Sequence, residues 1–257
     1  MNFSDIRFEF IKGRSDGLND NQIQSIRSII QEYIEKYPGM QLNFVCDFYH
    51  WDHYDEKFSI YSYLHDKDGI PYSKRDYMAR YNDIDKLIGF NHIRMSNLPI
   101  ENNELIQKVE DNKKRADLLE RKCKQLLSGN KNLNPHQTKS IAEFMDAKES
   151  IFSEQLKKNS CIKSADFDVA LIKCLEGNLF VKRLTLHEIG HAIAYNYNLA
   201  DDSIIQELFD RYRDDFNDDI HEFMAQCFMA SELTNSIPLA NKVKARFEYA
   251  NKNISTT

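Results

Sequence analysis

The chain has 257 residues, a formal net charge of −6, and 42% hydrophobic and 29% charged residues. This balance is typical of a folded globular protein and excludes a disordered or fibrous chain. The 8 glycines and 5 prolines are too few for the many tight turns of an all-β sandwich or barrel, so we expect helix to dominate. The net negative charge excludes a general nucleic-acid binder, because neutralising phosphates requires basic side chains.

The sequence gives no sign of a membrane or secretory segment. No apolar run approaches the ~20 residues that a spanning helix needs. The first residues, MNFSDIRFEFIKGRSDG, lack the apolar stretch of a signal peptide. The five cysteines are widely spaced and never form C-x-x-C, which is typical of reduced thiols. We expect no membrane contact, and a protein that is cytoplasmic or delivered without an N-terminal signal peptide.

The first half of the chain predicts one helix and a small sheet. Residues 18–37 carry isoleucines at helical spacing, and Pro38-Gly39 ends that run. After it come three short aromatic and β-branched segments, 41–49, 58–64 and 87–95, which predict strands.

The second half predicts helices throughout. Residues 101–159 are rich in Lys, Glu, Gln and Leu with a break near Ser128, which predicts a long helical hairpin. Residues 176–257 are helical again, with Asn178 as a candidate N-cap. We therefore expect a mostly helical α+β fold in one domain, 1–257. In it, 101–159 would be an insertion or module, and 176–257 the metal-binding catalytic core.

The strongest functional signal is the H-E-x-x-H motif formed by His187, Glu188 and His191. Residues four apart on a helix lie one turn above each other, so both imidazoles can bind one tetrahedral Zn²⁺. Glu188 is offset by about 100° around the helix and can reach a zinc-bound water without ligating the metal. The alternative interpretation is a helix with two histidines that are solvated or satisfied in the core.

The expected chemistry is hydrolysis of a peptide bond without a covalent intermediate. Zinc would lower the pKa of the bound water and polarise the substrate carbonyl. Glu188 would take the water proton and later give it to the leaving amine.

A catalytic zinc site needs a third protein ligand, and the candidates are Asp218, Asp219, His221 and Glu222. Residues 219–233 have the apolar stripe of a helix and a second, narrower face that includes Glu222 and the small Ala225. This helix could therefore pack on both sides and approach the H-E-x-x-H helix closely at Ala225. The pattern alone leaves His221 and Glu222 equally open.

The two segments LTLHEIGHAI and HEFMAQCFMA, separated by about thirty residues, resemble gluzincin zinc peptidases in which H-E-x-x-H is followed by E-F-x-A-x-x-F. The pattern is similar to the catalytic domain of anthrax-lethal-factor-like metallopeptidases, which occur in toxins and phage-associated proteins. It secondarily resembles ImmA/IrrE-type repressor peptidases. The resemblance implies a zincin-like fold, His187, His191 and Glu222 as zinc ligands, and Glu188 as general base.

One element of that family pattern is missing. Lethal-factor-like sites carry a tyrosine shortly before the third ligand, where it stabilises the oxyanion, but the nearest preceding tyrosine here is Tyr212, ten residues before Glu222. Hydrogen-bond donors to a developing oxyanion are usually important in acyl transfer. We take Tyr212 as the first candidate donor, with Tyr195, Tyr197 and His221 as alternatives.

Two further segments give weaker signals. The sequence His50-Trp51-Asp52-His53 contains metal-ligating residue types but has no matching second half, which favours an exposed aromatic loop. Residues 200–222 contain nine carboxylates and only two arginines. Such a stretch either forms a solvated surface or produces a negative electrostatic field that favours a basic substrate segment.

These observations predict a zinc-dependent endopeptidase of toxin, effector or phage-associated type that acts on a specific protein. An alternative is a non-catalytic or regulatory protein-binding module with a structural or degenerate zinc site. A structural site has four protein ligands and leaves no position for water, which distinguishes the two. A third possibility is a zinc hydrolase whose substrate is not protein.

Overall fold

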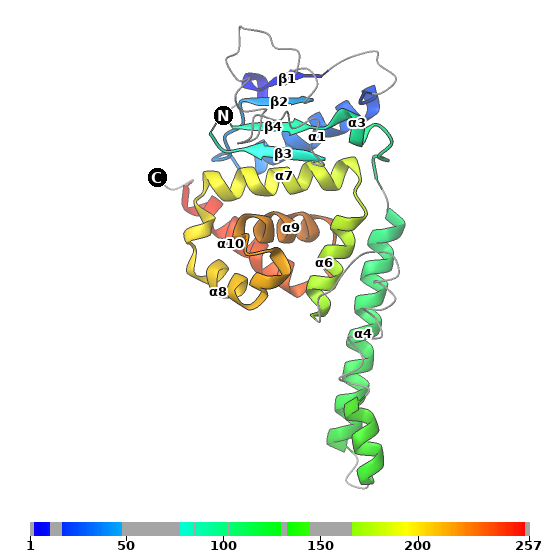
Figure 1. Ribbon diagram of the computed structural model, residues 1–257. Coiled ribbons are helices and arrows are strands. Elements are labelled where there is room, and N and C mark those ends of the chain that lie inside the picture. The colour runs from blue at the N-terminus through cyan, green and yellow to red at the C-terminus, as the bar shows by residue number, and fades with distance from the viewer. Residues whose placement is uncertain are drawn as a thin grey trace.

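The computed structural model describes residues 3–10, 17–47, 78–84, 86–101, 103–129, 133–143 and 166–254. These residues form an α+β fold in which helices dominate, with one small mixed sheet at one side (Figure 1). The expected fold class is confirmed at this level. Within this part of the chain, no helix combines the length and apolarity needed to cross a bilayer.

The sheet has four short strands in the order β1-β2-β4-β3. Their bounds are Arg7–Glu9 (β1), Phe44–Asp47 (β2), Ala79–Asn82 (β3) and Leu87–Phe90 (β4). The first three strands in the sheet order run parallel, whereas β3 pairs antiparallel to β4 with Tyr81 opposite Ile88. In the described part of the sheet, β3 is therefore an edge strand of opposite direction.

Helix α1 (Asp20–Lys36) confirms the first predicted helix. Its N-terminus is closed by a capping box, in which Asn19 accepts a hydrogen bond from the Gln22 backbone at 2.9 Å and the Gln22 side chain accepts one from the Asn19 backbone at 2.8 Å. The isoleucines of its apolar stripe are buried in the core, as their spacing predicts.

The prediction for residues 87–95 was wrong in its second half. Strand β4 ends at Phe90, and a short helix α3 (His92–Met95) follows. The reason is Asn91, whose side chain accepts a hydrogen bond from the Arg94 backbone at 3.3 Å and thereby caps a helix. The predicted strand 58–64 lies outside the described residues.

The helices after the sheet form successive layers. Helix α7 (Val181–Asn196) lies along β3 and α1, α9 (Ile220–Leu233) packs on α7, and α10 (Pro238–Ile254) packs on α9 (Figure 1). Helix α6 (Phe167–Gly177) borders α9. Helix α8 (Ser203–Tyr212) lies between α7 and α9 in the chain, and 3-10 turns at Leu199–Asp201 and Arg213–Phe216 join it to them. Helix α9 is buried on several sides, as its two apolar faces predict.

Helices α7 and α9 approach closely at Gly190. A Cβ atom added at Gly190 would lie 2.9 Å from the Ala225 Cα atom and 3.2 Å from the Phe228 Cβ atom. Only a glycine opposite a small residue permits this spacing. The close contact brings the two segments expected to hold the metal together.

The candidate cap Asn178 does not begin α7. It is the C-cap residue of α6, and Phe180 precedes the first turn of α7 without a side-chain capping bond. The carbonyl of Asn178 accepts a hydrogen bond from the Arg183 guanidinium, which is 1% exposed and also lies over the Phe180 ring. Asn178 thus ends one helix, and Arg183 joins that end to the start of the next.

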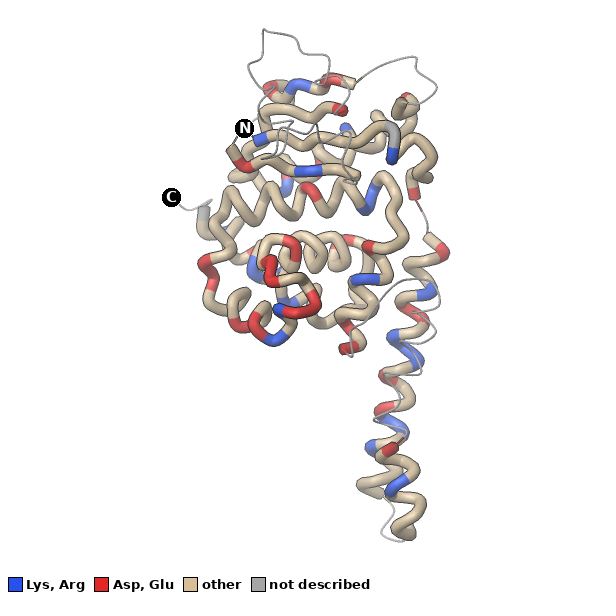
Figure 2. Tube along the Cα trace, in the orientation of Figure 1, with Lys and Arg blue, Asp and Glu red and all other residues tan. Residues whose placement is uncertain are grey.

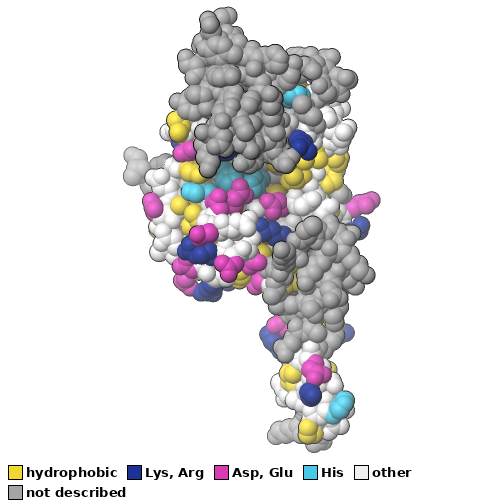
Figure 3. All heavy atoms as spheres, in the orientation of Figure 1, with side chains coloured by type: hydrophobic (Ala, Val, Ile, Leu, Met, Phe, Trp, Pro, Cys, Tyr) yellow, Lys and Arg dark blue, Asp and Glu magenta, His cyan; other side chains and the backbone are white. Residues whose placement is uncertain are grey.

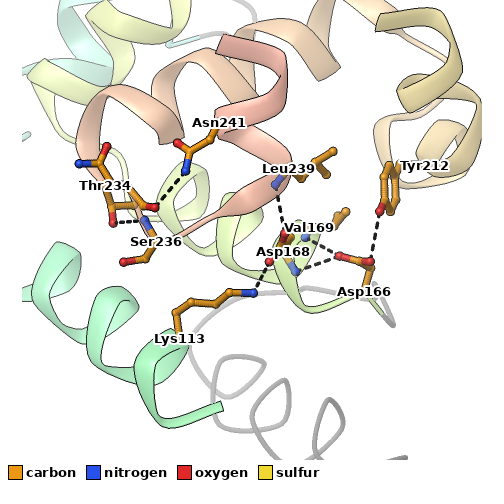
Figure 4. Close-up of polar contacts among 10 residues, drawn as sticks. Lys113, Asp166, Asp168, Val169, Tyr212, Thr234, Ser236, Leu239 and Asn241 are labelled. Atoms are coloured by element: carbon orange, nitrogen blue, oxygen red, sulfur yellow. Dashed lines mark hydrogen bonds and ion pairs between the residues drawn. The ribbon is translucent and has the colours of Figure 1, made fainter. Parts of the chain in front are cut away.

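Helix α4 (Asn103–Gly129) extends away from the body (Figure 1). It ends at Gly129, close to the predicted break, and helix resumes at 135–143, so the described part of 101–159 agrees with a helical hairpin. Residues 144–159 lie outside the described residues. Near the body, the Lys113 Nζ atom lies 2.6 Å from Asp168 Oδ1 (Figure 4). The Thr234 hydroxyl donates to Glu110 at 3.1 Å.

The C-terminal end of α7 is tied to two other helices by what we call the Tyr197 network. The Tyr197 hydroxyl accepts from the Gly39 backbone at 2.9 Å and donates to Asn251 at 2.9 Å. The Asn251 side chain donates in turn to the Lys36 carbonyl at 2.8 Å. These bonds join the ends of α1, α7 and α10.

Candidate metal centre

Three side chains from two helices converge on one point. His187 and His191 lie one turn apart on α7, and their Nε2 atoms are 3.1 Å apart. Glu222, in the first turn of α9, places Oε2 3.3 Å from His187 Nε2 and Oε1 3.4 Å from His191 Nε2. The three nominated zinc ligands therefore face one another.

The spacing of these donors fits a tetrahedral cation. Four ligands held about 2.0–2.1 Å from Zn²⁺ lie about 3.3 Å from each other, close to the three measured separations. Among the described residues, no fourth His, Cys, Asp or Glu joins the group. Three protein ligands with one open position are typical of catalytic rather than structural zinc sites.

The two aspartate candidates, Asp218 and Asp219, have structural roles. Asp219 is the N-cap of α9, where its Oδ1 atom accepts from the backbones of His221 at 2.9 Å and Glu222 at 3.1 Å. Asp218 pairs with Arg213 on the surface. The cap fixes the turn of helix from which Glu222 points to the histidines.

The electrostatics of the cluster favour positive charge. Burial would raise the pKa of Glu222, but hydrogen bonds from His187 and His191 outweigh it and hold this pKa far below its ordinary value. Burial would lower the pKa of His187, but the hydrogen bond with Glu222 and the nearby carboxylates, including Glu188 and Glu176, raise it to about 9. A cation between these groups is therefore stabilised.

Glu188 is prepared as a base. Its side chain is 3% exposed, the backbone N–H of Tyr81 donates to it, and its Oε2 atom has no hydrogen-bond partner among the described residues. Burial raises the pKa of this carboxyl group, while the charges of His187 and His191 lower it in part. An unpartnered buried carboxylate oxygen needs a donor, such as a reacting water.

A pocket of about 280 Å³ opens onto this cluster. Its walls come from three elements: Ala79, Arg80 and Tyr81 of β3; His187, Glu188, His191 and Tyr195 of α7; and Asp219, His221 and Glu222 at the start of α9. In the space-filling view, histidine side chains reach the surface at the centre of the face with carboxylates directly below them (Figure 3). A substrate could reach the site from this face.

Tyr195 and His221 lie together in the pocket. Their rings are stacked with centroids 4.0 Å apart and an interplanar angle of 2°. Burial lowers the pKa of His221 and raises that of Tyr195, so both are neutral near pH 7. Tyr197, the other alternative donor, belongs to the Tyr197 network at the end of α7.

The first candidate donor, Tyr212, is not in the pocket. Its hydroxyl points to Asp166 Oδ2 at 3.4 Å, beside the N-terminus of α6 (Figure 4). The 3-10 turn Arg213–Phe216 and two left-handed residues, Asn217 and Asp218, separate Tyr212 from α9 and turn the chain. The assignment of Tyr212 to the oxyanion is therefore corrected to Tyr195 and His221 as the candidates near the cluster.

The acidic stretch gathers around α8 and the turn after it (Figure 2). Several of its carboxylates are already paired: Glu207 with Arg211, Asp210 and Asp218 with Arg213, and Asp202 with Arg246. The pairs of Arg211 and Arg213 are exposed and contribute little stability, whereas Asp202–Arg246 is half-buried. All of them reduce the field available to a substrate. A basic substrate segment stays a prediction.

Two parts of the site were not found from the sequence. Strand β3 contributes Tyr81 and Arg80, and its four residues carry no pattern that indicates pairing with β4 or contact with α7. The Glu176 and Gln226 pair beside Glu222 joins α6 to α9, two segments that no local spacing relates. The weaker metal candidate around His50 and His53 lies outside the described residues.

Comparison with protein-family models, curated proteins and solved structures finds no match. The residues of this chain and their geometry are therefore the basis for assigning a function.

Proposed function

We propose that this chain is a zinc-dependent endopeptidase with a zincin-like arrangement. The observation that carries the proposal is the convergence of His187, His191 and Glu222 at tetrahedral spacing, with no fourth ligand among the described residues. The unpartnered oxygen of Glu188 beside the open position supports a catalytic rather than a structural role.

The three ligands would hold Zn²⁺, which when bound supplies Lewis-acid activation of water and of a carbonyl. Glu188 would accept the proton of the attacking water at Oε2 and transfer it to the nitrogen of the leaving amine. The backbone N–H of Tyr81 holds the carboxylate in place for both transfers.

The carbonyl oxygen of the substrate gains negative charge as water attacks, and it needs hydrogen-bond donors. Tyr195 and His221 line the same pocket as Glu188 and are the donors we propose. Their stacking holds each ring in one orientation, so less reorganisation is needed at the moment of reaction.

A peptide substrate is supported by the position of β3. Its residues line the pocket, and within the described sheet it is an edge strand. Edge strands pair readily with an extended chain through backbone hydrogen bonds. The projecting α4 would add a surface for one specific protein substrate, as expected of a toxin, effector or phage-associated enzyme.

A second candidate function is a binding module that keeps a zinc site without catalysis. The observation that favours it is the exposure of Leu118, Leu126 and Leu127 on α4, where apolar side chains could contact a partner.

Metal content tests the proposal first. Mass spectrometry of the purified, zinc-supplemented protein should find about one zinc per chain in the wild type and much less in Glu222→Ala, because two ligands rarely retain zinc. Glu188→Gln should keep its zinc but lose hydrolysis of a proteome-derived peptide library. Glu207→Ala, an exposed carboxylate on α8, serves as the matched control and should behave as wild type.

No zinc in folded wild-type protein would contradict the proposal and favour the binding module. Zinc binding together with hydrolysis that persists after chelation would also contradict it.

A further inference from the structure

Glu176, near the end of α6, lies beside the metal centre without belonging to its ligand set. It lines a second pocket together with Glu222 and Gln226 of α9. Among the described residues, the side chains whose ligand atoms converge within 4.8 Å of one another are His187, His191 and Glu222. Glu176 is therefore a neighbour of the metal ligands and not one of them.

Gln226 connects Glu176 to the helix that carries Glu222. It follows Glu222 by four residues on α9, so it lies one helical turn further along the same side. Its side chain is 4% exposed, and its Nε2 atom donates to Glu176 Oε1 at 2.6 Å. This bond holds the Glu176 carboxylate about one turn of α9 away from the ligand Glu222.

The negative charge of Glu176 is only partly neutralised by its basic neighbour, Lys173. The Lys173 Nζ atom lies 3.8 Å from Glu176 Oε2, which is longer than an ordinary hydrogen bond. The same ammonium group also lies 4.3 Å from the centre of the Phe216 ring. Some of the field of the Glu176 carboxylate therefore remains to act on the metal centre.

This field reaches the histidine ligands. Burial lowers the pKa of His187, but Glu222, Glu188 and Glu176 raise it. Burial raises the pKa of Glu176, and the charges of Lys173 and His187 lower it in part. A carboxylate that stabilises a positive charge on an imidazole also stabilises a divalent cation bound to that imidazole.

We infer that Glu176 strengthens metal binding at the centre through its negative charge, without ligating the ion. Two neutral imidazoles and one carboxylate leave a bound Zn²⁺ with an excess of positive charge, and carboxylates around the ligands stabilise it. The bond from Gln226 keeps this carboxylate in place, and Lys173 opposes its effect. The inference rests on the proposed zinc site, but it does not depend on catalysis.

A purely structural role of Glu176, as a link between α6 and α9, makes a different prediction. Glu176→Gln keeps an oxygen that accepts from Gln226 but removes the charge. Lys173→Met keeps the apolar contact with Phe216 but removes the opposing charge. If charge is the cause, the two variants change zinc affinity in opposite directions, whereas damage to the structure would weaken zinc binding in both.

The experiment measures the zinc affinity of the full chain at neutral pH by competition with a chromophoric chelator. Glu176→Gln should bind zinc about tenfold more weakly than wild type, as expected when a group around the ligands is altered. Lys173→Met should bind it about two- to threefold more tightly, because an opposing charge is gone. Glu207→Gln makes the same change as Glu176→Gln at an exposed position of α8 and should bind as wild type.

A second measurement separates charge from ligand geometry. The visible absorption of bound Co²⁺ reports the type and arrangement of its ligands. Glu176→Gln loaded with Co²⁺ should give the wild-type spectrum, because the three ligands are unchanged. A different spectrum would show that Glu176 acts by shaping the ligand set and would overturn the inference.

Unchanged zinc affinity in Glu176→Gln, or weaker binding in both variants, would also overturn the inference. Lys173→Met keeps the test valid if Glu176→Gln does not fold, since affinity equal to or below that of wild type would contradict the role of charge. Wild-type protein that binds zinc but cleaves no peptide would refute the peptidase and leave this inference standing. Wild-type protein that binds no zinc would refute both.

Discussion

Tyr195 repeats the spacing of the two histidines of the metal centre. It lies four residues after His191 on α7, so it points to the same side of the helix. The stacked ring of His221 then comes from α9. The same helical geometry that aligns the two histidines therefore also places the Tyr195 side chain on their side of α7.

Replacing Tyr195 by Phe should lower kcat by about 10²-fold, because one donor to the developing oxyanion is lost. KM and zinc content should change little, since the ligands are intact. Steady-state kinetics on any peptide cleaved by the wild type would measure kcat and KM separately. Tyr212→Phe is the control, and a larger loss in that variant than in Tyr195→Phe would contradict the assignment.

Glu232 shows how the stability contributed by one buried carboxylate depends on pH. It accepts hydrogen bonds from Tyr33 on α1, from Lys36 at 3.0 Å and from Lys244 at 3.0 Å. Burial would raise its pKa, but these partners lower it below the ordinary value of 4.5. A lowered pKa contributes stability that is complete above pH 4.5 and is lost as the pH falls through the pKa of the folded state.

Glu232→Gln should therefore reduce the free energy of unfolding by about 1–3 kcal/mol at pH 7. The difference from wild type should shrink when both proteins are compared near pH 3. Urea denaturation at the two pH values measures it. A difference that is the same at both pH values would show that the charge of Glu232 is not responsible.

The residues of the site differ in how far the sequence could predict them. His187, Glu188 and His191 follow from local spacing, because a helix fixes the direction of residues one and four positions apart. Glu222 was distinguished from His221 only through a family resemblance, since both stand in the first turn of α9. Tyr212 was misplaced because distance along the sequence has no fixed meaning across a turn with left-handed residues.

At the scale of elements, the contact of α7 with α9 depends on Gly190 facing Ala225. The predicted close approach at Ala225 is confirmed by this contact. The two histidines lie on α7 and Glu222 lies on α9. The separation of the two helices therefore sets the distance between the histidines and Glu222.

Gly190→Ala should push the helices apart. Its Cβ atom would lie 2.9 Å from the Ala225 backbone, which cannot move as a flexible side chain can. We expect a loss of about 1–3 kcal/mol in stability and weaker zinc binding. Thermal unfolding and zinc titration measure the two effects, and a variant as stable and as tight in zinc binding as wild type would contradict this account.

The elements were predictable where the pattern was long. Helix α1 has 17 residues with a clear apolar stripe, and its prediction was confirmed. Strands β1 and β3, with 3 and 4 residues, are too short to show alternation, and both were missed. The helix α3 was missed because Asn91 ends the strand by capping, a signal that the aromatic and β-branched residues around it obscure.

At the scale of the whole molecule, the ligands of the metal centre join two helices that are separated by α8 and the turns around it. A ligand that binds only the folded state stabilises it by mass action. Zinc should therefore affect the stability of the whole α7–α10 region and not only that of the site.

At a free zinc concentration of about 100 times Kd, the stabilisation is about 2.7 kcal/mol, which raises Tm by roughly 5–10 °C for a chain of this size. Calorimetry with zinc and with a chelator measures the shift. Glu222→Ala should show little of it, and Glu207→Ala should show all of it. Equal shifts in the two variants would place the stabilising zinc elsewhere.

The Tyr197 network has a consequence for hydrogen exchange. The last turn of a terminal helix ordinarily frays, so its amide protons exchange through small local openings. Here Asn251 of α10 is bonded to Tyr197 at the end of α7 and to Lys36 at the end of α1. Opening that turn disturbs the helix that carries both histidines, and the exchange rates at the end of α10 therefore report on the integrity of the metal-binding helix.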